Sequence, residues 1–254
     1  MDYINLLNDK SVTTFFLLFI RWSSLFAFLP IFNSTSIPNV IKASFVVWFT
    51  FVTYPLVPQV TFEPTLNNIF LSIINEVTFG FFTGIALQIV FMILSFAGEL
   101  ISFVMGLTMA NVVDPSSGVQ TPVIGQFFNL VAITIFLAVD GHHAMILLIA
   151  KSLHSMPFGS FFEMRHMGEY LMMEMGKFFV LGFSIAFPIL AISILSDIIF
   201  GMIMKSMPQF NLLVIGFPIK IGLSFAVIMA ILTSMMFLFK KEMFSVIKIL
   251  STFI

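Results

Sequence analysis

Long apolar runs fill most of this 254-residue chain and constrain the surroundings in which it can fold. Hydrophobic residues make up 59% and charged residues 9%, whereas a soluble domain has roughly 45–50% apolar and about 25% charged residues. So much apolar surface must be covered by a bilayer or by a large protein partner. The composition therefore predicts an all-α integral membrane protein. Its apolar runs are residues 12–32, 40–57, 69–109, 123–139 (continued by 144–153), 178–200 and 212–239.

The third run contains no proline and would form about 60 Å of helix, twice the thickness of a hydrocarbon core of roughly 30 Å. We interpret it as one long helix that extends beyond the membrane, in preference to two spans joined by a tight turn near residues 95–99. Gly80 and Gly84 form a GxxxG pattern within it, which predicts close packing against another helix. Pro188 and Pro218 each predict a kink in the last two runs, and residues 156–168 are expected to form the longest loop.

The first run is too long for the apolar part of a cleaved signal and is expected to be a retained helix. With six spans, both ends of the chain lie on the same side of the membrane. That side carries most of the lysines and arginines, so the positive-inside rule places both ends in the cytoplasm.

Several classes of function are disfavoured by composition and motif. The net charge of −1 gives no reason to expect nucleic acid, and the absence of cysteine excludes disulfides and cysteine-based metal sites. Ser116 and Ser117 lack the pattern of a nucleophile elbow. Asp140, His142 and His143 are metal-ligating types, but adjacent residues on a helix point about 100° apart, so we interpret them as a polar helix junction. We expect no catalytic residue, no cofactor and no metal.

Five charges within or beside the apolar runs are expected to be buried, and a buried charge in a membrane protein calls for a partner or a function. We favour ion pairs that fix packing or assembly over a proton-carrying role, which would fall to Glu76 or Glu99. Asp197 and Lys220 flank the last turn and are expected to pair within that hairpin. The five residues are Arg21, Glu76, Glu99, Asp197 and Lys220.

A polar break interrupts the apolar pattern in the middle of the chain. Asp-Pro-Ser-Ser-Gly at residues 114–118 is typical of a turn: proline presets one dihedral angle, aspartate and serine bond the local backbone, and glycine permits a positive φ. From its residues alone, this stretch is either an ordinary loop between spans or a constriction within a larger structure.

The residues around this break carry a resemblance to a known family. Residues 98–118 read GELISFVMGLTMANVVDPSSG, and a second signature joins PQFN at 208–211 with IGFPIK at 215–220. DGH at 140–142 and MPFG at 156–159 add to the match, which is collinear to about residue 222. This pattern resembles the FliR family of flagellar export proteins, whose injectisome relatives form the SctT family.

The resemblance implies a non-enzymatic subunit of the type III export gate in the bacterial inner membrane, at the flagellar basal body. Its partners would be FliP-like, FliQ-like and FlhB-like subunits, membrane lipid, and unfolded export substrates in transit. It also implies long kinked helical hairpins, partly raised above the membrane plane, with a FliP-like portion at residues 1–178 and a FliQ-like hairpin at residues 179–254.

Two sets of site residues follow from the resemblance. Loop 106–122 would be the plug of the export pore, with Met109 and Val112 at positions where relatives often place phenylalanine. Its residues are Gly106, Met109, Asn111, Val112, Asp114, Pro115, Ser116, Ser117 and Gly118. The turn of the last hairpin would consist of Pro208, Gln209, Asn211, Gly216 and Pro218.

Two alternatives remain open at this point. One is a self-contained secondary transporter for a small solute, which would need broken helices and a polar site at the membrane midplane. The other is a subunit of an injectisome rather than of a flagellum, and the overall similarity favours the flagellum.

Overall fold

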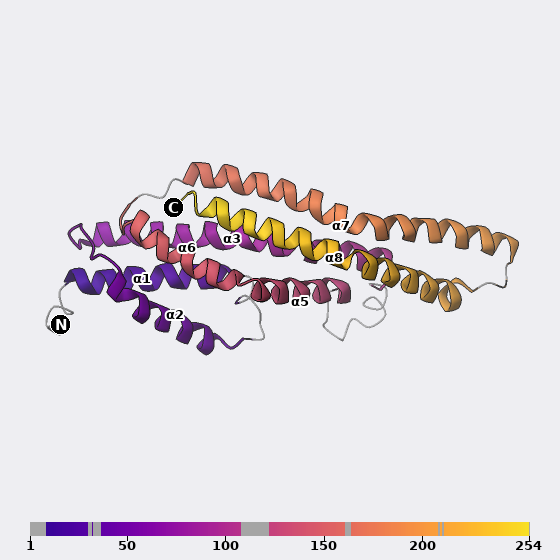
Figure 1. Cartoon of the computed structure of the whole chain (residues 1–254), viewed down its shortest axis with the longest axis horizontal. Helices are drawn as coiled ribbons and strands as arrows, with labels where there is room; N and C mark the ends of the chain where they lie inside the picture. Colours follow the sequence, from indigo (N-terminus) through magenta and orange to yellow (C-terminus); the bar gives the residue numbers. More distant parts are fainter. Residues whose placement is uncertain are drawn as a thin grey trace. The chain divides into compact units, whose positions relative to one another are not determined.

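The computed structural model describes residues 9–29, 32, 37–107, 122–160, 164–207, 209 and 211–253. Within these ranges the chain is built of helices and contains no β-strand, which confirms the predicted all-α fold (Figure 1). In chain order the helices are α1 (Asp9–Phe28), α2 (Asn39–Thr53), η2 (Tyr54–Leu56), α3 (Leu66–Val104), α5 (Val123–Ala138), α6 (Gly141–Ser155), α7 (Met164–Ser206), η4 (Leu212–Gly216) and α8 (Phe217–Leu250).

Three helices, α3, α7 and α8, are longer than a bilayer requires. The 39 residues of α3 are uninterrupted, so the preference for one long helix over two spans is confirmed. The 43 residues of α7 correspond to about 64 Å at 1.5 Å per residue. Helices of this length project beyond a hydrocarbon core of roughly 30 Å unless they are strongly tilted.

Five helices of the described chain are long and apolar enough to cross a membrane, or up to six if α5 and α6 count together as one span. The sequence-based orientation assumed six spans. An odd number would place the two ends on opposite sides, so the cytoplasmic location of both ends stays a prediction.

The chain forms two compact units made of interleaved segments. Unit 1 comprises residues 1–89, 140–174 and 243–254, and unit 2 comprises residues 90–139 and 175–242. The helix α7 runs without a break through residue 178, where the FliP-like portion was expected to end. The division into a FliP-like and a FliQ-like portion remains a prediction. It concerns resemblance to two partner proteins, whereas the two units are defined by the compactness of the fold.

The core of unit 1 is organised by the helical hairpin of α1 and α2. Trp22 is fully buried, stacks on Phe49 with ring centroids 4.8 Å apart, and donates a hydrogen bond from Nε1 to Thr53 Oγ1 at 3.0 Å. Leu17 and Leu18 are fully buried beside it along α1. One face of α1 is therefore held in a packed interior, and Arg21 lies next to this core in the sequence.

The core of unit 2 is aromatic. Phe91 of α3 lies 5.5 Å from Phe136 of α5 and 5.3 Å from Phe239 of α8, measured between ring centroids. On α7, a Cβ added to Gly182 would lie 2.6 Å from Cδ1 of Phe96, so this helix crosses α3 closely. These contacts make the end of α3 a rigid support.

Two local expectations are corrected. Residues 164–168, placed in the longest loop from the sequence, are the first part of α7, because Met and Arg are good helix formers and no proline lies among these residues. Pro218 is the second residue of α8, where its missing N–H needs no partner, so it begins a helix after the π-helical η4 instead of kinking one from within.

Candidate functional site

A buried ion pair joins α1 to α3 in unit 1. The guanidinium of Arg21 forms a two-pronged contact with the Glu76 carboxylate: Nε donates to Oε2, and an Nη donates to Oε1 at 2.8 Å. Their side chains are only 4% and 3% exposed. Paired hydrogen bonds between charged groups are among the strongest polar contacts in proteins. The expected ion pair that fixes packing is present at these two positions.

The rest of the arginine side chain is enclosed by α6 and the turn that follows it. Arg21 donates to Ser152 Oγ at 3.3 Å and to the Met156 carbonyl at 3.1 Å. The rings of Phe158 and Phe79 lie 4.9 Å and 5.4 Å from its Cζ, measured to the ring centroids, within the range of cation–π attraction. This environment holds Arg21 as a structural cation, with Glu76 as its counter-ion.

The GxxxG pattern of α3 lies against the same part of α1. A Cβ on Gly80 would overlap the Ser24 side chain and come within 2.8 Å of the Leu25 backbone N, and one on Gly84 would overlap Phe28. The Ser24 hydroxyl donates to the Glu76 carbonyl at 3.2 Å. The predicted close-packing face is confirmed, and it brings the two backbones near enough for Arg21 to reach Glu76.

The beginning of the predicted plug loop is anchored in unit 2. Gly106 has φ +80°, and a Cβ there would lie 2.5 Å from the Phe217 ring. The Ser193 hydroxyl of α7 donates to the Val104 carbonyl at 2.9 Å, which satisfies a carbonyl at the end of α3. The chain therefore enters residues 108–121 from a point held by α7 and α8.

The second ion pair lies beside this anchor. Lys220 Nζ donates to both carboxylate oxygens of Asp197, each at 2.8 Å, so the expected pairing within the last hairpin is confirmed. The Lys220 side chain is 9% exposed and that of Asp197 is 59% exposed, so the carboxylate is not buried as expected. The pair borders a pocket of about 240 Å³ lined by Phe103, Val104, Gly106, Asp197, Phe200, Leu212, Gly216, Phe217 and Lys220.

The far end of the loop returns to α3. At the start of α5, which Pro122 precedes, Gly125 faces Gly98 of α3 so closely that a Cβ on Gly98 would lie 2.6 Å from the Gly125 Cα. Glu99 is adjacent and, contrary to expectation, exposed. Within the described part of the chain it has no ion pair or hydrogen-bond partner for its carboxylate.

The other predicted loop and turn residues are placed as follows. Gln209 and Asn211 lie between α7 and η4, whereas Gly216 ends the π-helix and Pro218 is in α8, so these two are helical and not part of the turn. The remaining positions lie outside the described residues: Met109, Asn111, Val112, Asp114, Pro115, Ser116, Ser117, Gly118 and Pro208.

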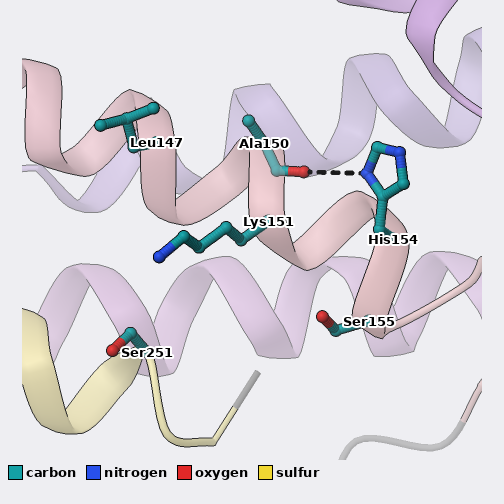
Figure 2. Close-up of a pocket in the computed structure, with 6 residues that line it drawn as sticks. All are labelled: Leu147, Ala150, Lys151, His154, Ser155 and Ser251. Carbon is teal, nitrogen blue, oxygen red and sulfur yellow. Dashed lines mark hydrogen bonds between the residues drawn. The ribbon is translucent and has the colours of Figure 1, made fainter.

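A second pocket, of about 370 Å³, lies in unit 1 between α6 and the end of α8 (Figure 2). The His154 ring contacts the Ala150 carbonyl through Nδ1 at 3.4 Å, and Lys151 points away from that ring. The six lining residues include no carboxylate and no nucleophile paired with a base. Separately, Asp140, His142 and His143 at the start of α6 form a group with metal-ligating side chains.

Two partners of Arg21 were missed from the sequence, namely Ser152 and the Met156 carbonyl. The only signal near them was the MPFG motif, which contains Met156 and Phe158. Its glycine, Gly159, has φ +86°, and a Cβ there would lie 2.8 Å from the Phe62 ring, so the turn that presents the carbonyl requires glycine.

Comparison with known proteins agrees with this architecture. The family model "Bacterial export proteins, family 1" matches residues 12–246. The chain is 32% identical over 212 residues to the flagellar biosynthetic protein FliR of Pectobacterium carotovorum subsp. carotovorum, covering 83% of this chain and 80% of that protein. It is 27% identical over 236 residues to FliR of Bacillus subtilis (strain 168), covering 91% and 90%, and 27% identical over 229 residues to FliR of Escherichia coli (strain K12), covering 89% and 86%.

Proposed function

Because this chain belongs to family 1 of the bacterial export proteins, the FliR family, we propose that it forms part of the flagellar export gate and that segment 106–122 closes the gate's pore. The chain is a membrane-located subunit of the flagellar protein export apparatus. We further propose that it works without enzymatic chemistry and resides in the bacterial inner membrane. Family membership favours the flagellar gate over both the solute transporter and the injectisome considered from the sequence.

One observation carries the proposal of a pore closure: both ends of the polar segment are attached to rigid helices of the same unit. Gly106 is held against Phe217, and α5 is held against α3 at Gly98 and Gly125. The two positions, Gly98 within α3 and Gly106 just beyond its end, are eight residues apart along the chain. Both ends of the proposed plug are therefore held by helices of unit 2.

The chemistry of the segment suits a seal. An export pore must pass an unfolded polypeptide and still block ions when idle. An apolar constriction opposes wetting, and flexible apolar side chains contact varied sequences without strong preference. Met109 and Val112 would provide this surface, while Asp114 to Gly118 would provide the turn.

The two carboxylates of α3 take different roles in this proposal. Glu76 is paired on both oxygens with Arg21, so it serves packing. Glu99 is exposed and is free to meet a partner subunit or a proton. We propose FliP-like, FliQ-like and FlhB-like subunits as the partners that cover the exposed apolar surface around it.

The pore closure is tested by deleting residues 110–116 and measuring ion leak through the complex assembled with its partners. We expect increased leak from an otherwise assembled complex, because the seal is lost while both helix anchors remain. A matched control is Lys151→Ala, an exposed change in unit 1, which should leave the leak unchanged. Unaltered conductance in the deletion would rule out this segment as the plug.

A further inference from the structure

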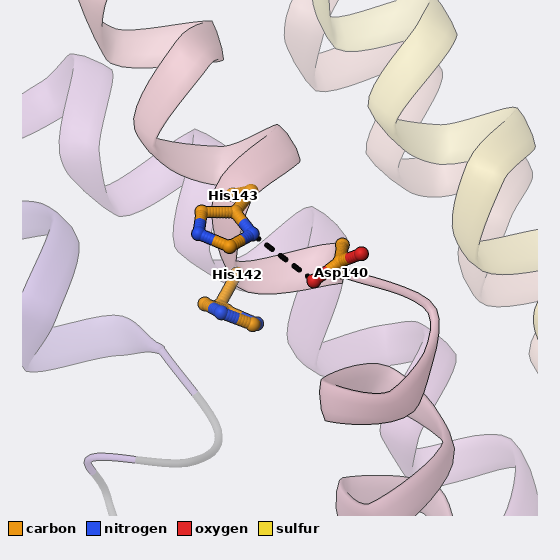
Figure 3. Close-up of side chains that lie close together, drawn as sticks. All are labelled: Asp140, His142 and His143. Carbon is orange, nitrogen blue, oxygen red and sulfur yellow. Dashed lines mark hydrogen bonds and ion pairs between the residues drawn. The ribbon is translucent and has the colours of Figure 1, made fainter.

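A cluster of metal-ligating side chains lies at the start of α6, and it shares no residue with either ion pair or with segment 106–122. Asp140, His142 and His143 each offer one ligand atom, and these atoms all lie within 4.8 Å of one another. Figure 3 shows the three side chains gathered at the first turn of the helix. They come from four consecutive positions, so the local backbone alone holds them together.

The backbone conformation of Asp140 produces this arrangement. Its φ is +57°, the only positive φ of a non-glycine residue in the described chain, and it lies immediately before α6. An aspartate before a helix commonly accepts hydrogen bonds from the first free N–H groups. Here the carboxylate makes no such capping bond and instead accepts from His143 Nδ1 at 3.1 Å. The side chain is directed to the histidine at the expense of the helix cap.

The second histidine completes the group. The His142 and His143 rings have centroids 4.2 Å apart and an interplanar angle of 35°, so the two imidazoles lie side by side although their residues are adjacent on a helix. His142 Nδ1 is buried and has no hydrogen-bond partner among the described residues. A buried polar atom without a partner costs free energy, and a metal bound through it would remove that cost.

We propose that Asp140, His142 and His143 bind a divalent transition metal, with Zn²⁺ as the preferred ion. Zinc bonds to histidine nitrogen and carboxylate oxygen at about 2.0–2.2 Å in tetrahedral geometry, so two ligand atoms of one ion lie about 3.4 Å apart. The candidate ligand atoms lie within 4.8 Å of one another, so side-chain rotations that bring them closer by at most about 1.4 Å would complete the site. The adjacent spacing of the histidines argued against a metal site from the sequence, but in the structure their ring centroids lie only 4.2 Å apart.

The choice of ion follows from the donors. Two imidazoles and one carboxylate suit zinc and neighbouring transition metals, whereas Mg²⁺ and Ca²⁺ prefer oxygen ligands throughout. Three protein ligands leave a coordination position for water or for a fourth ligand from a partner subunit. The site is independent of the pore closure, so either proposal can fail while the other stands.

Binding is tested on the full-length protein, purified in detergent through a tag that contains no histidine, by calorimetric titration with Zn²⁺ alone. We expect about one ion per chain, and a loss of affinity of about tenfold or more in Asp140→Asn and in His143→Gln, because each removes one of three ligands. Asparagine tolerates a positive φ, so Asp140→Asn leaves the backbone undisturbed. The matched control is His154→Gln, an exposed histidine near the other end of α6, which should bind as the unsubstituted chain does.

A second measurement uses the unsubstituted protein, so that its result does not depend on whether the substituted proteins fold correctly. Diethylpyrocarbonate modifies accessible imidazoles, and the modified residues are identified by peptide mass spectrometry. We expect Zn²⁺ to protect His143 while His154 reacts equally with and without the ion, and Mg²⁺ to protect neither. Absence of stoichiometric binding, equal loss of affinity in the His154→Gln control, or no protection of His143 would overturn the site.

Discussion

Arg21 shows how a single charge can be accommodated in an apolar interior. Its fork-shaped guanidinium reaches a carboxylate, a hydroxyl and a carbonyl from three different parts of unit 1. Removing two charges from water is costly, and the cost is offset only when nearly every donor has a partner. The pair therefore specifies how α1, α3 and the turn after α6 fit together more than it adds to net stability.

Arg21→Ala is expected to destabilise the chain by about 3–5 kcal/mol, because it leaves the Glu76 carboxylate buried without a counter-ion. Thermal unfolding in detergent, followed by the fluorescence of the nearby buried Trp22, measures the loss. The control is Lys10→Ala, which breaks the exposed Lys10–Glu63 pair (3.1 Å) and should cost less than about 1 kcal/mol. Equal effects of the two substitutions would contradict the structural role assigned to Arg21.

At the scale of elements, close helix crossings determine where the site residues lie. The crossing of α1 and α3 depends on Gly80 and Gly84, and the crossing of α3 and α5 depends on Gly98 and Gly125. In a membrane, packing of small residues replaces the hydrophobic drive between helices. The first crossing brings Arg21 to Glu76, and the second returns the chain to α3 after the plug segment.

Gly80→Ala and Gly84→Ala are each expected to lower the thermal stability in detergent, because the added methyl group overlaps α1. An overpacked contact costs typically about 1–3 kcal/mol. Gly176→Ala in α7 is the matched control: nothing lies within 4 Å of the added Cβ, so alanine should stabilise this helix by up to about 1 kcal/mol. Stabilisation by all three substitutions would mean that α1 and α3 do not cross as closely as described.

At the scale of the whole molecule, much apolar surface is left uncovered. Met229 and Phe237 of α8 are each 71% exposed, and Met202 of α7 is 68% exposed. Lipid or partner helices must cover such a surface. Glu99 is an exposed carboxylate on this apolar surface. When lipid or another subunit covers it, the carboxylate needs a cation, a hydrogen-bond donor or a proton.

Glu99→Gln is expected to leave the unfolding temperature of the isolated chain unchanged and to reduce export, because the carboxylate has no partner within the described chain. Glu76→Gln, by contrast, should lower the unfolding temperature of the isolated chain, because it removes the buried counter-ion of Arg21. Co-purification with partner subunits and secretion of a flagellar substrate are measured for both variants. If the Glu99→Gln complex assembles but does not secrete, a proton role for Glu99 is favoured. If the complex does not assemble, a contact between Glu99 and a partner subunit is favoured. Normal assembly with normal secretion would exclude both roles.

The helical class, the uninterrupted α3, its glycine face and the pairing of Asp197 with Lys220 were all predictable from local patterns. Apolar periodicity, the absence of proline and the proximity of residues in one hairpin are properties of neighbouring positions. The loop predicted at residues 156–168 was wrong for 164–168, where Met and Arg favour a helix. The exposure of Glu99 and Asp197 was unpredictable, since an apolar neighbourhood in sequence does not specify which face of a helix is covered.

By itself, the sequence determined that this chain folds into long apolar helices and belongs with flagellar export proteins, because composition and motifs are properties of the chain read in order. Only the tertiary structure decided that Arg21 pairs with Glu76 rather than with another carboxylate. It also decided that both ends of segment 106–122 are attached to helices of unit 2, and that two adjacent histidines lie beside one aspartate. Such pairings depend on helix crossings and on one positive φ, and neither is encoded in the spacing of residue types.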